Sequence, residues 1–146
     1  SAIDSTSSAE AETDSDALKA FMARRGEPGG EAICRAGSGG EDYYRVTPAP
    51  GDIEIEKLLF SSFHGTALDE ILCVRGIDTL LVCGITTECC VDATVRDAFH
   101  HGYHVFVVSD ACAAYDNDMH YNTLKVLERN CSLLATTEAV TAAWAT

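Results

Sequence analysis

Basic residues are scarce in this 146-residue chain, which has 10 Lys and Arg against 23 Asp and Glu and a formal net charge of −13. This excess of acid disfavours nucleic acids and anionic membranes as partners. The sequence also lacks an apolar run long enough to span a bilayer, and its first residues lack the basic and then apolar pattern of a secretory signal. We therefore expect a soluble, cytoplasmic protein that binds neither nucleic acid nor membrane.

The regular cysteine spacing of a disulfide framework or a zinc site is absent too. The seven cysteines cannot all pair, and they lie inside apolar runs. We expect most of them to be small buried hydrophobic residues in a reducing compartment, and we expect no metal site and no cofactor. Their positions are Cys34, Cys73, Cys83, Cys89, Cys90, Cys112 and Cys131.

The chain has the length of one domain, but its composition divides it in two. Residues 1–50 form an acidic, glycine-rich N-terminal segment, in which a short helix is predicted from a cap at Ser15 to a stop at Gly26. Residues 51–146 alternate strongly between two kinds of element and form the predicted core.

Apolar strands alternate with amphipathic helices along the core, which is typical of a parallel sheet covered by helices on both faces. We therefore predict a three-layer α/β/α fold. Thr66 is the expected cap of its first helix. Strands are predicted at 52–60, 78–84, 104–110 and 132–137, and helices at 66–76, 87–101, 118–130 and 138–145.

A thiol pair stands where the strand at 78–84 turns into a helix, in the segment "GITTECCV". If that helix begins near Thr87 or Glu88, Cys90 lies in its first turn, where free backbone N–H groups and the helix dipole favour a thiolate. The same N–H groups can receive the oxyanion of a tetrahedral intermediate. Cys89 points about a hundred degrees away around the helix, so the two thiols cannot face one pocket. The plainer interpretation is that both cysteines pack in the core.

The blocks "EKLLFSSFHGTALDEILCVRGIDTLLVCG" and "GITTECCVDATVRDAFHHGYHVFVVSDACAA" resemble the C-terminal half of the isochorismatase-like cysteine hydrolases. In that superfamily the amidases carry Cys directly before Val in a G-x-x-T-x-x-C-V block, and here that residue is Cys90. The resemblance implies a Rossmann-like fold and an amidase rather than an enzyme that cleaves isochorismate.

The resemblance also implies roles for particular residues. Cys90 would be the nucleophile and Lys57, at the end of a strand, the cation beside it; without the resemblance Lys57 reads as a solvated surface lysine. A cis peptide is expected between Ile85 and Thr86. The backbone N–H groups of Thr86 and Cys90 would then form the oxyanion hole.

The expected chemistry is attack of the Cys90 thiolate on a small amide or ureide, formation of a thioester, and its hydrolysis by water. The substrate is expected to be carbamoyl-like, as in the branch acting on biuret and ureidoacrylate. Phe63, His64 and Tyr115 are candidates for the pocket lining, with ordinary packing or solvation as the alternative. His120, at a helix start, could border the pocket in the same way, with a solvated histidine as the alternative.

The family's third catalytic residue, an Asp at the end of a first apolar strand, has no clear counterpart. Asp4 follows only two apolar residues, too few for a central strand, and Asp110 reads as a cap or turn residue. We therefore expect the first two strands to be missing, and a second polypeptide of a split or processed hydrolase to supply them with the Asp in a homo- or hetero-oligomer. The alternative is a catalytically inactive binding or oligomerisation module.

Overall fold

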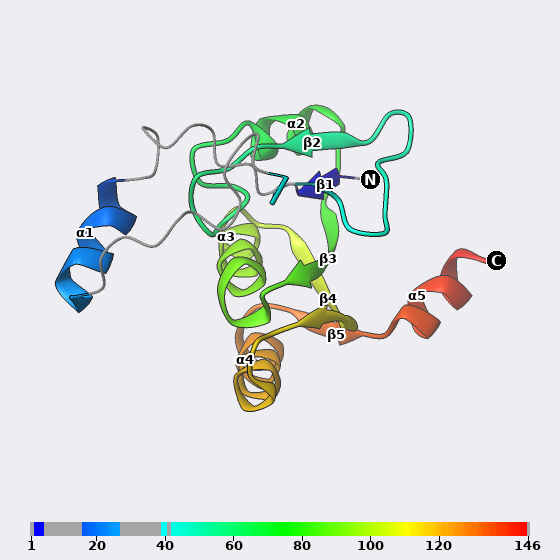
Figure 1. The fold of residues 1–146 in the computed structure, drawn as a ribbon. Coiled ribbons are helices and arrows are strands. Elements are labelled where there is room, and N and C mark those ends of the chain that lie inside the picture. The colour runs from blue at the N-terminus through cyan, green and yellow to red at the C-terminus, as the bar shows by residue number, and fades with distance from the viewer. Residues whose placement is uncertain (1, 5–15, 27–38, 41, 146) are drawn as a thin grey trace. The chain divides into compact units, whose positions relative to one another are not determined.

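The computed structural model describes residues 2–4, 16–26, 39–40 and 42–145 (Figure 1). Two compact units, Ser1–Thr66 and Ala67–Thr146, make up the chain. The boundary predicted between residues 50 and 51 stays a prediction. Ser15, with residues 5–14 of the acidic stretch, and the glycine-rich segment 27–38 lie outside the described residues.

The described residues of the first unit form one helix and a two-stranded parallel sheet. Helix α1, Asp16–Arg25, has two arginines in its last turn and is followed by Gly26 at φ 70°, the left-handed conformation that ends a helix, as predicted. Strand β1, Ala2–Asp4, pairs with β2, Ile53–Ile55, with Asp4 opposite Ile55.

These strands differ from the prediction in one respect and add a feature that was not predicted. The added feature is β1, in which three residues find a partner in β2, because a parallel ladder needs only an available edge and not a long apolar run. The strand predicted at 52–60 is also shorter, since β2 ends at Ile55. The wider expectation, that strands of the family sheet are missing from this chain, stays a prediction.

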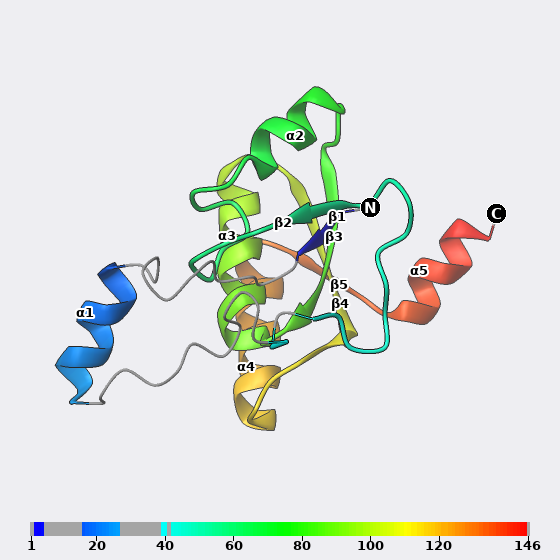
Figure 2. The ribbon, with the colours of Figure 1, turned by 45° about the horizontal axis from the view of Figure 1, so that its top comes forward.

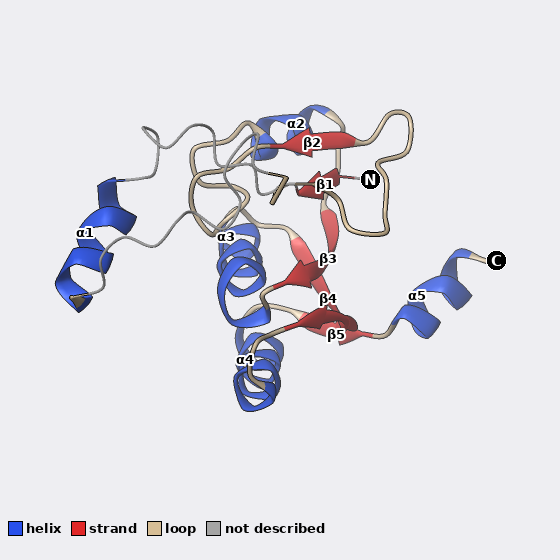
Figure 3. Ribbon diagram, in the orientation of Figure 1, coloured by secondary structure: helices blue, strands red, loops and turns tan. Residues whose placement is uncertain are grey.

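The second unit is built on three parallel strands in the order β3-β4-β5, which confirms the predicted alternation of strands and helices. Figure 3 shows α3 and α4 along one face of these strands. The buried core forms there, from residues such as Val95 of α3, Val107 of β4 and Leu127 of α4. The elements are α2 Leu68–Val74, β3 Thr79–Ile85, α3 Asp92–His100, β4 His104–Ala113, α4 Asn117–Asn130, β5 Leu133–Ala135 and α5 Thr137–Trp144.

The opposite face of the three strands is more open. Leu81, Phe106 and Leu133 are neighbours in register across it, and the side chains of Leu81 and Leu133 are 42% and 58% exposed. Helix α5 projects away from the strands in both views (Figures 1 and 2), and none of its described residues is buried. The packed core of this unit therefore lies on the α3 and α4 side.

The start of α2 differs from the prediction. Thr66 does not cap it; Ala67 is the residue before the helix, and the Thr66 hydroxyl donates instead to the carbonyl of Ser62 at 2.6 Å. The helix begins at Leu68, so Thr66 lies one residue before the cap position that Ala67 occupies. No helix in the described ranges has the length and apolarity needed to cross a membrane.

Candidate active site

Cys90 lies in a wide turn that connects β3 to α3. The peptide bond between Ile85 and Thr86 is cis, at the place the resemblance implies, and a π-helical turn covers Thr87–Val91 before α3 begins at Asp92. Because ligands of parallel α/β sheets bind beyond the carboxyl ends of the strands, this turn occupies the usual place for a site. The helical structure starts at Thr87, as the sequence predicts.

The hydrogen bonds of this turn pass over one amide. The Thr86 carbonyl accepts from the N–H groups of Cys89 at 3.1 Å and Val91 at 3.2 Å, three and five residues ahead. A regular α-helix would use the fourth amide, that of Cys90, which is not among its donors in the described part of the chain. The wide turn therefore diverts the Cys90 N–H from its ordinary helical acceptor.

The side chains of the turn divide between the core and the surface. Thr87 and Val91 are buried, whereas Glu88, Cys89 and Cys90 are half-buried. One carboxylate oxygen of Glu88 is buried and has no hydrogen-bond partner among the described residues. A negative charge in this turn opposes a second one on Cys90, so a thiolate here needs a compensating cation.

The expectation of buried cysteines is wrong for the six that the structure describes. They form no disulfide, and each is exposed or half-buried. Cys83 is exposed because it shares the open face of β3 with Leu81. Burial still raises the pKa of the Cys112 and Cys131 thiols. Among the described residues, no three or more His, Cys, Asp or Glu side chains are grouped so that they could hold a metal.

Lys57 is a buried residue of the first unit, with only 6% of its surface exposed. Its ammonium donates to the carbonyl of Leu59 at 3.1 Å. The interpretation of Lys57 as a solvated surface lysine is therefore wrong. A buried ammonium with a carbonyl partner still has two protons to donate, which suits a group that binds an anion.

The predicted pocket residues fall in both units. Phe63, in the first unit, is buried, and His64 beside it is exposed. Tyr115, in the second unit, is 87% exposed. The role of these three side chains, like the pairing of Lys57 with Cys90, stays a prediction.

Asp110 caps the last helix. Its carboxylate accepts from the Thr137 N–H at 2.8 Å and from the Thr137 hydroxyl at 2.6 Å. These hydrogen bonds lower the pKa of the Asp110 carboxyl. Asp110 therefore serves the first amide of α5 from β4, beside the N-cap Thr136, and its interpretation as a cap or turn residue rather than the catalytic acid stays a prediction.

One contact of the turn escaped prediction. The Thr87 hydroxyl lies 2.8 Å from Nδ1 of His120 in α4. The sequence marks both residues separately, Thr87 by its motif and His120 by its place at a helix start. Nothing in their spacing indicates that they meet, because they are 33 positions apart and lie on different helical elements.

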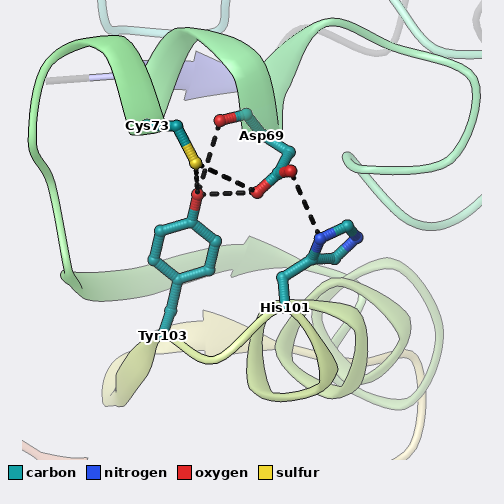
Figure 4. Close-up of polar contacts among 4 residues, drawn as sticks. All are labelled: Asp69, Cys73, His101 and Tyr103. Atoms are coloured by element: carbon teal, nitrogen blue, oxygen red, sulfur yellow. Dashed lines mark hydrogen bonds and ion pairs between the residues drawn. The ribbon is translucent and has the colours of Figure 1, made fainter.

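A second polar cluster lies at the other end of the strands (Figure 4). Tyr103 donates to an Asp69 carboxylate oxygen at 2.8 Å, His101 Nδ1 lies 3.4 Å from the other oxygen, and Cys73 Sγ lies 3.6 Å from the Tyr103 hydroxyl. Burial, followed by the bond to Asp69, raises the pKa of Tyr103. The cluster ties α2 to the segment before β4, far along the strands from the Cys90 turn.

The described surface also has a hollow of about 480 Å³ at the amino ends of the strands. Thr79, His104 and Leu133, the first residues of β3, β4 and β5, line it with the end of α4. Its position opposite the Cys90 turn separates it from the chemistry expected there.

Comparison with known proteins extends these observations. The isochorismatase domain family matches residues 8–139. The ureidoacrylate amidohydrolase RutB of Pseudomonas syringae pv. syringae is 42% identical over 100 residues, which are 66% of this chain and 39% of that protein. The ureidoacrylate amidohydrolase RutB of Methylorubrum extorquens is 43% identical over 100 residues, which again are 66% of this chain and 39% of that protein. The chain thus spans about two fifths of the length of these curated relatives.

Solved structures share the fold. An isochorismatase-like hydrolase from Alkaliphilus metalliredigens superposes with a TM-score of 0.82 at 26% identity, over 98% of this chain and 72% of that one. The N-carbamoylsarcosine amidase from Thermoplasma acidophilum superposes with a TM-score of 0.73 at 28% identity, over 92% of this chain and 70% of that one. These likenesses confirm the predicted α/β fold with a parallel sheet. Since the matching domain covers most of the sequence, the chain belongs to the isochorismatase family.

Proposed function

We propose that this protein is a cysteine-dependent amidohydrolase that cleaves a C–N bond of a small amide or ureide. The observation that carries the proposal is the position of Cys90 in a wide turn at the carboxyl end of β3, within an isochorismatase domain. Relatives named ureidoacrylate amidohydrolase support the same class of reaction.

In the proposed reaction, the Cys90 sulfur attacks the substrate carbonyl carbon and forms a tetrahedral intermediate. The Thr86 and Cys90 N–H groups donate to its oxyanion, which fits the diversion of the Cys90 amide from the helix. The C–N bond then breaks, and an acid protonates the departing nitrogen. Water attacks the resulting thioester, releases the acid product and returns the thiol.

Lys57 is the proposed cation for this reaction. It is buried, so little solvent screens its charge, and the turn already contains the carboxylate of Glu88. An ammonium beside Cys90 would offset that carboxylate and stabilise the thiolate. Lys57 is therefore the side chain of this protein best suited to the charge that the mechanism requires.

The acid has two proposed sources. Asp4 ends β1, and its backbone lies opposite Ile55, two residues before Lys57, so parallel pairing brings Asp4 and Lys57 to the same edge of the first unit's sheet. The alternative is an Asp on a second polypeptide that completes the sheet in a homo- or hetero-oligomer. The strand pairing favours Asp4.

The proposed substrate carries an N-carbamoyl group. Ureidoacrylate and N-carbamoylsarcosine, the compounds in the names of two similar proteins, share this group and differ in the rest of the molecule. A site that holds the carbamoyl carbonyl in an oxyanion hole would accept both. The proposed setting is the cytoplasm, where thiols stay reduced.

A catalytically inactive binding module is the second candidate. It is favoured by one observation, that the turn holds a buried Glu88 carboxylate oxygen without a hydrogen-bond partner among the described residues, which opposes a thiolate on Cys90. Such a module would keep the fold and lack the acid that completes turnover.

A screen of small amides and ureides for ammonia release tests the proposal. We expect Cys90→Ala to abolish release and Cys89→Ala to retain most of it, because consecutive helical side chains point in different directions. Equal losses in both variants would contradict the assignment of the nucleophile. If no substrate releases ammonia and iodoacetamide modifies Cys90 no faster than an ordinary exposed thiol, the inactive module is the better description.

A further inference from the structure

The buried hydroxyl of Thr87 connects the Cys90 turn to a different helix. Thr87 is the first residue of the turn and has no exposed surface. Its Oγ1 lies 2.8 Å from Nδ1 of His120, within hydrogen-bond distance. A buried hydroxyl that lost this partner would pay the full cost of desolvation, so the contact constrains both elements.

His120 is itself firmly held. It lies in the first turn of α4, where its N–H donates to the Asp116 carbonyl at 3.0 Å. The Asp116 side chain caps the same turn by accepting from the Met119 N–H at 2.9 Å. The His120 ring also packs edge-on against Tyr121, with centroids 5.1 Å apart. These contacts hold His120 in place, so its imidazole can fix the position of the Thr87 hydroxyl.

The turn that Thr87 begins competes with a regular α-helix. Thr86 accepts from Cys89 and Val91, and the Asp92 N–H donates to the carbonyls of Thr87 and Cys89. A shift of this segment to α-helical geometry would return the Cys90 amide to the Thr86 carbonyl. Because Thr87 lies at the beginning of the turn, anchoring its side chain resists that shift.

We propose that His120 is a positioning residue that acts through Thr87 to hold the wide turn and, with it, the thiol and amide of Cys90. This inference rests on the proposed role of Cys90 as the nucleophile. His120 need not touch the substrate for this role; its partner is the Thr87 hydroxyl.

Two matched pairs of variants test the inference through site-specific alkylation by iodoacetamide, followed by peptide mass spectrometry with the exposed Cys73 of α2, which lies outside the turn, as an internal reference. His120→Asn places a polar atom near the position of Nδ1, whereas His120→Gln places one near Nε2. Thr87→Ser keeps the hydroxyl, whereas Thr87→Val keeps the shape and removes it.

We expect Thr87→Val and His120→Gln to slow Cys90 alkylation at least about ten-fold. Losses of this size are typical when a residue that orients a functional group through a hydrogen bond is replaced. Thr87→Ser and His120→Asn should keep most of the wild-type rate, with alkylation of Cys73 unchanged throughout. If Cys90 reacts fast in the wild-type protein and equally fast in Thr87→Val and His120→Gln, the positioning role of His120 is wrong. The proposed role of Cys90 as the nucleophile would stand.

Two other outcomes also count against it. Equal slowing in all four variants, with a matching fall in melting temperature, would show that the contact serves only stability. Equal reactivity of Cys89 and Cys90 in the wild-type protein would overturn the nucleophile role, and the inference with it.

Discussion

Gly84, just before the cis peptide, has a backbone conformation that other residues rarely adopt, with φ at 131°. An added Cβ would meet no atom within 4 Å, so the cost of Gly84→Ala is conformational rather than steric. We expect it to lower the free energy of unfolding by about 1–2 kcal/mol, measured by urea denaturation.

Gly102 provides the control, because it also has a positive φ, 92°, with open space around it, but lies before β4 at the other end of the strands. Both alanine variants should lose stability. Only Gly84→Ala should also slow alkylation of Cys90, since only Gly84 leads into its turn. Unchanged unfolding of Gly84→Ala would show that alanine tolerates this conformation.

At the residue level, the sequence predicts a site through motifs and misses the contacts between motifs. The start of the helical turn at Thr87 follows from the strand-to-helix pattern, which is a local property, whereas the role of Cys90 comes from the family motif and stays a prediction. The Thr87 to His120 contact depends on how α4 packs against the turn, and no local pattern contains that information. The exposure of Cys83 was missed because an apolar run does not indicate which face of the sheet is covered.

Among the elements, α5 is joined to β4 by the Asp110 carboxylate, which accepts two hydrogen bonds from Thr137. The pKa of Asp110 is lowered below its ordinary value of 3.8 by the hydrogen bonds from Thr137, so the folded state binds the proton less readily than the unfolded chain does. The stabilisation is complete above the unfolded value and is lost as the pH falls through the lower, folded value. We expect hydrogen exchange of the Thr137 amide to accelerate as the pH is lowered past about 4, after correction for intrinsic rates.

Asp110→Asn should produce faster exchange at neutral pH, because the neutral amide is a weaker acceptor than the carboxylate. Glu138→Gln is the matched control, since it removes a charge from the first turn of α5 and leaves the Asp110 bonds in place. Equal effects of the two variants would mean that general charge near the helix start, and not the Asp110 cap, holds α5.

The elements of the core were predictable because their periodicity is strong, and β3, β4, α3 and α4 all occur where expected. Strand β1 was not, because three residues carry no periodicity and become a strand only through pairing with β2. The end of β2 was also missed, since "DIEIEKLLF" alternates beyond Ile55 while the chain does not remain paired. Pairing partners, rather than pattern, decided both cases.

For the whole molecule, the open question of the acid can be tested with the intact protein. If Asp4 protonates the leaving group, Asp4→Asn should abolish ammonia release and leave Cys90 alkylation unchanged, because alkylation needs no acid. Lys57→Met should slow both, since it removes the cation that stabilises the thiolate.

Native mass spectrometry of the purified assembly provides the complementary measurement. With Asp4 as the acid, copies of this chain alone should release ammonia. A second, shorter polypeptide in every active assembly, together with full activity of Asp4→Asn, would assign the acid to that partner.

The path of β4 has a consequence for how this protein changes during evolution. Val82 pairs with Val107 and Gly84 with Cys112, so Cys83 alone stands opposite the four residues 108–111. Within that excursion, Val108 pairs with β5 and Asp110 caps α5. A bulge of this kind accommodates extra residues in one strand without shifting the pairing beyond it. We therefore expect related chains to vary in length at the positions of residues 108–111 more than at the Cys90 turn, which an alignment of their sequences would check.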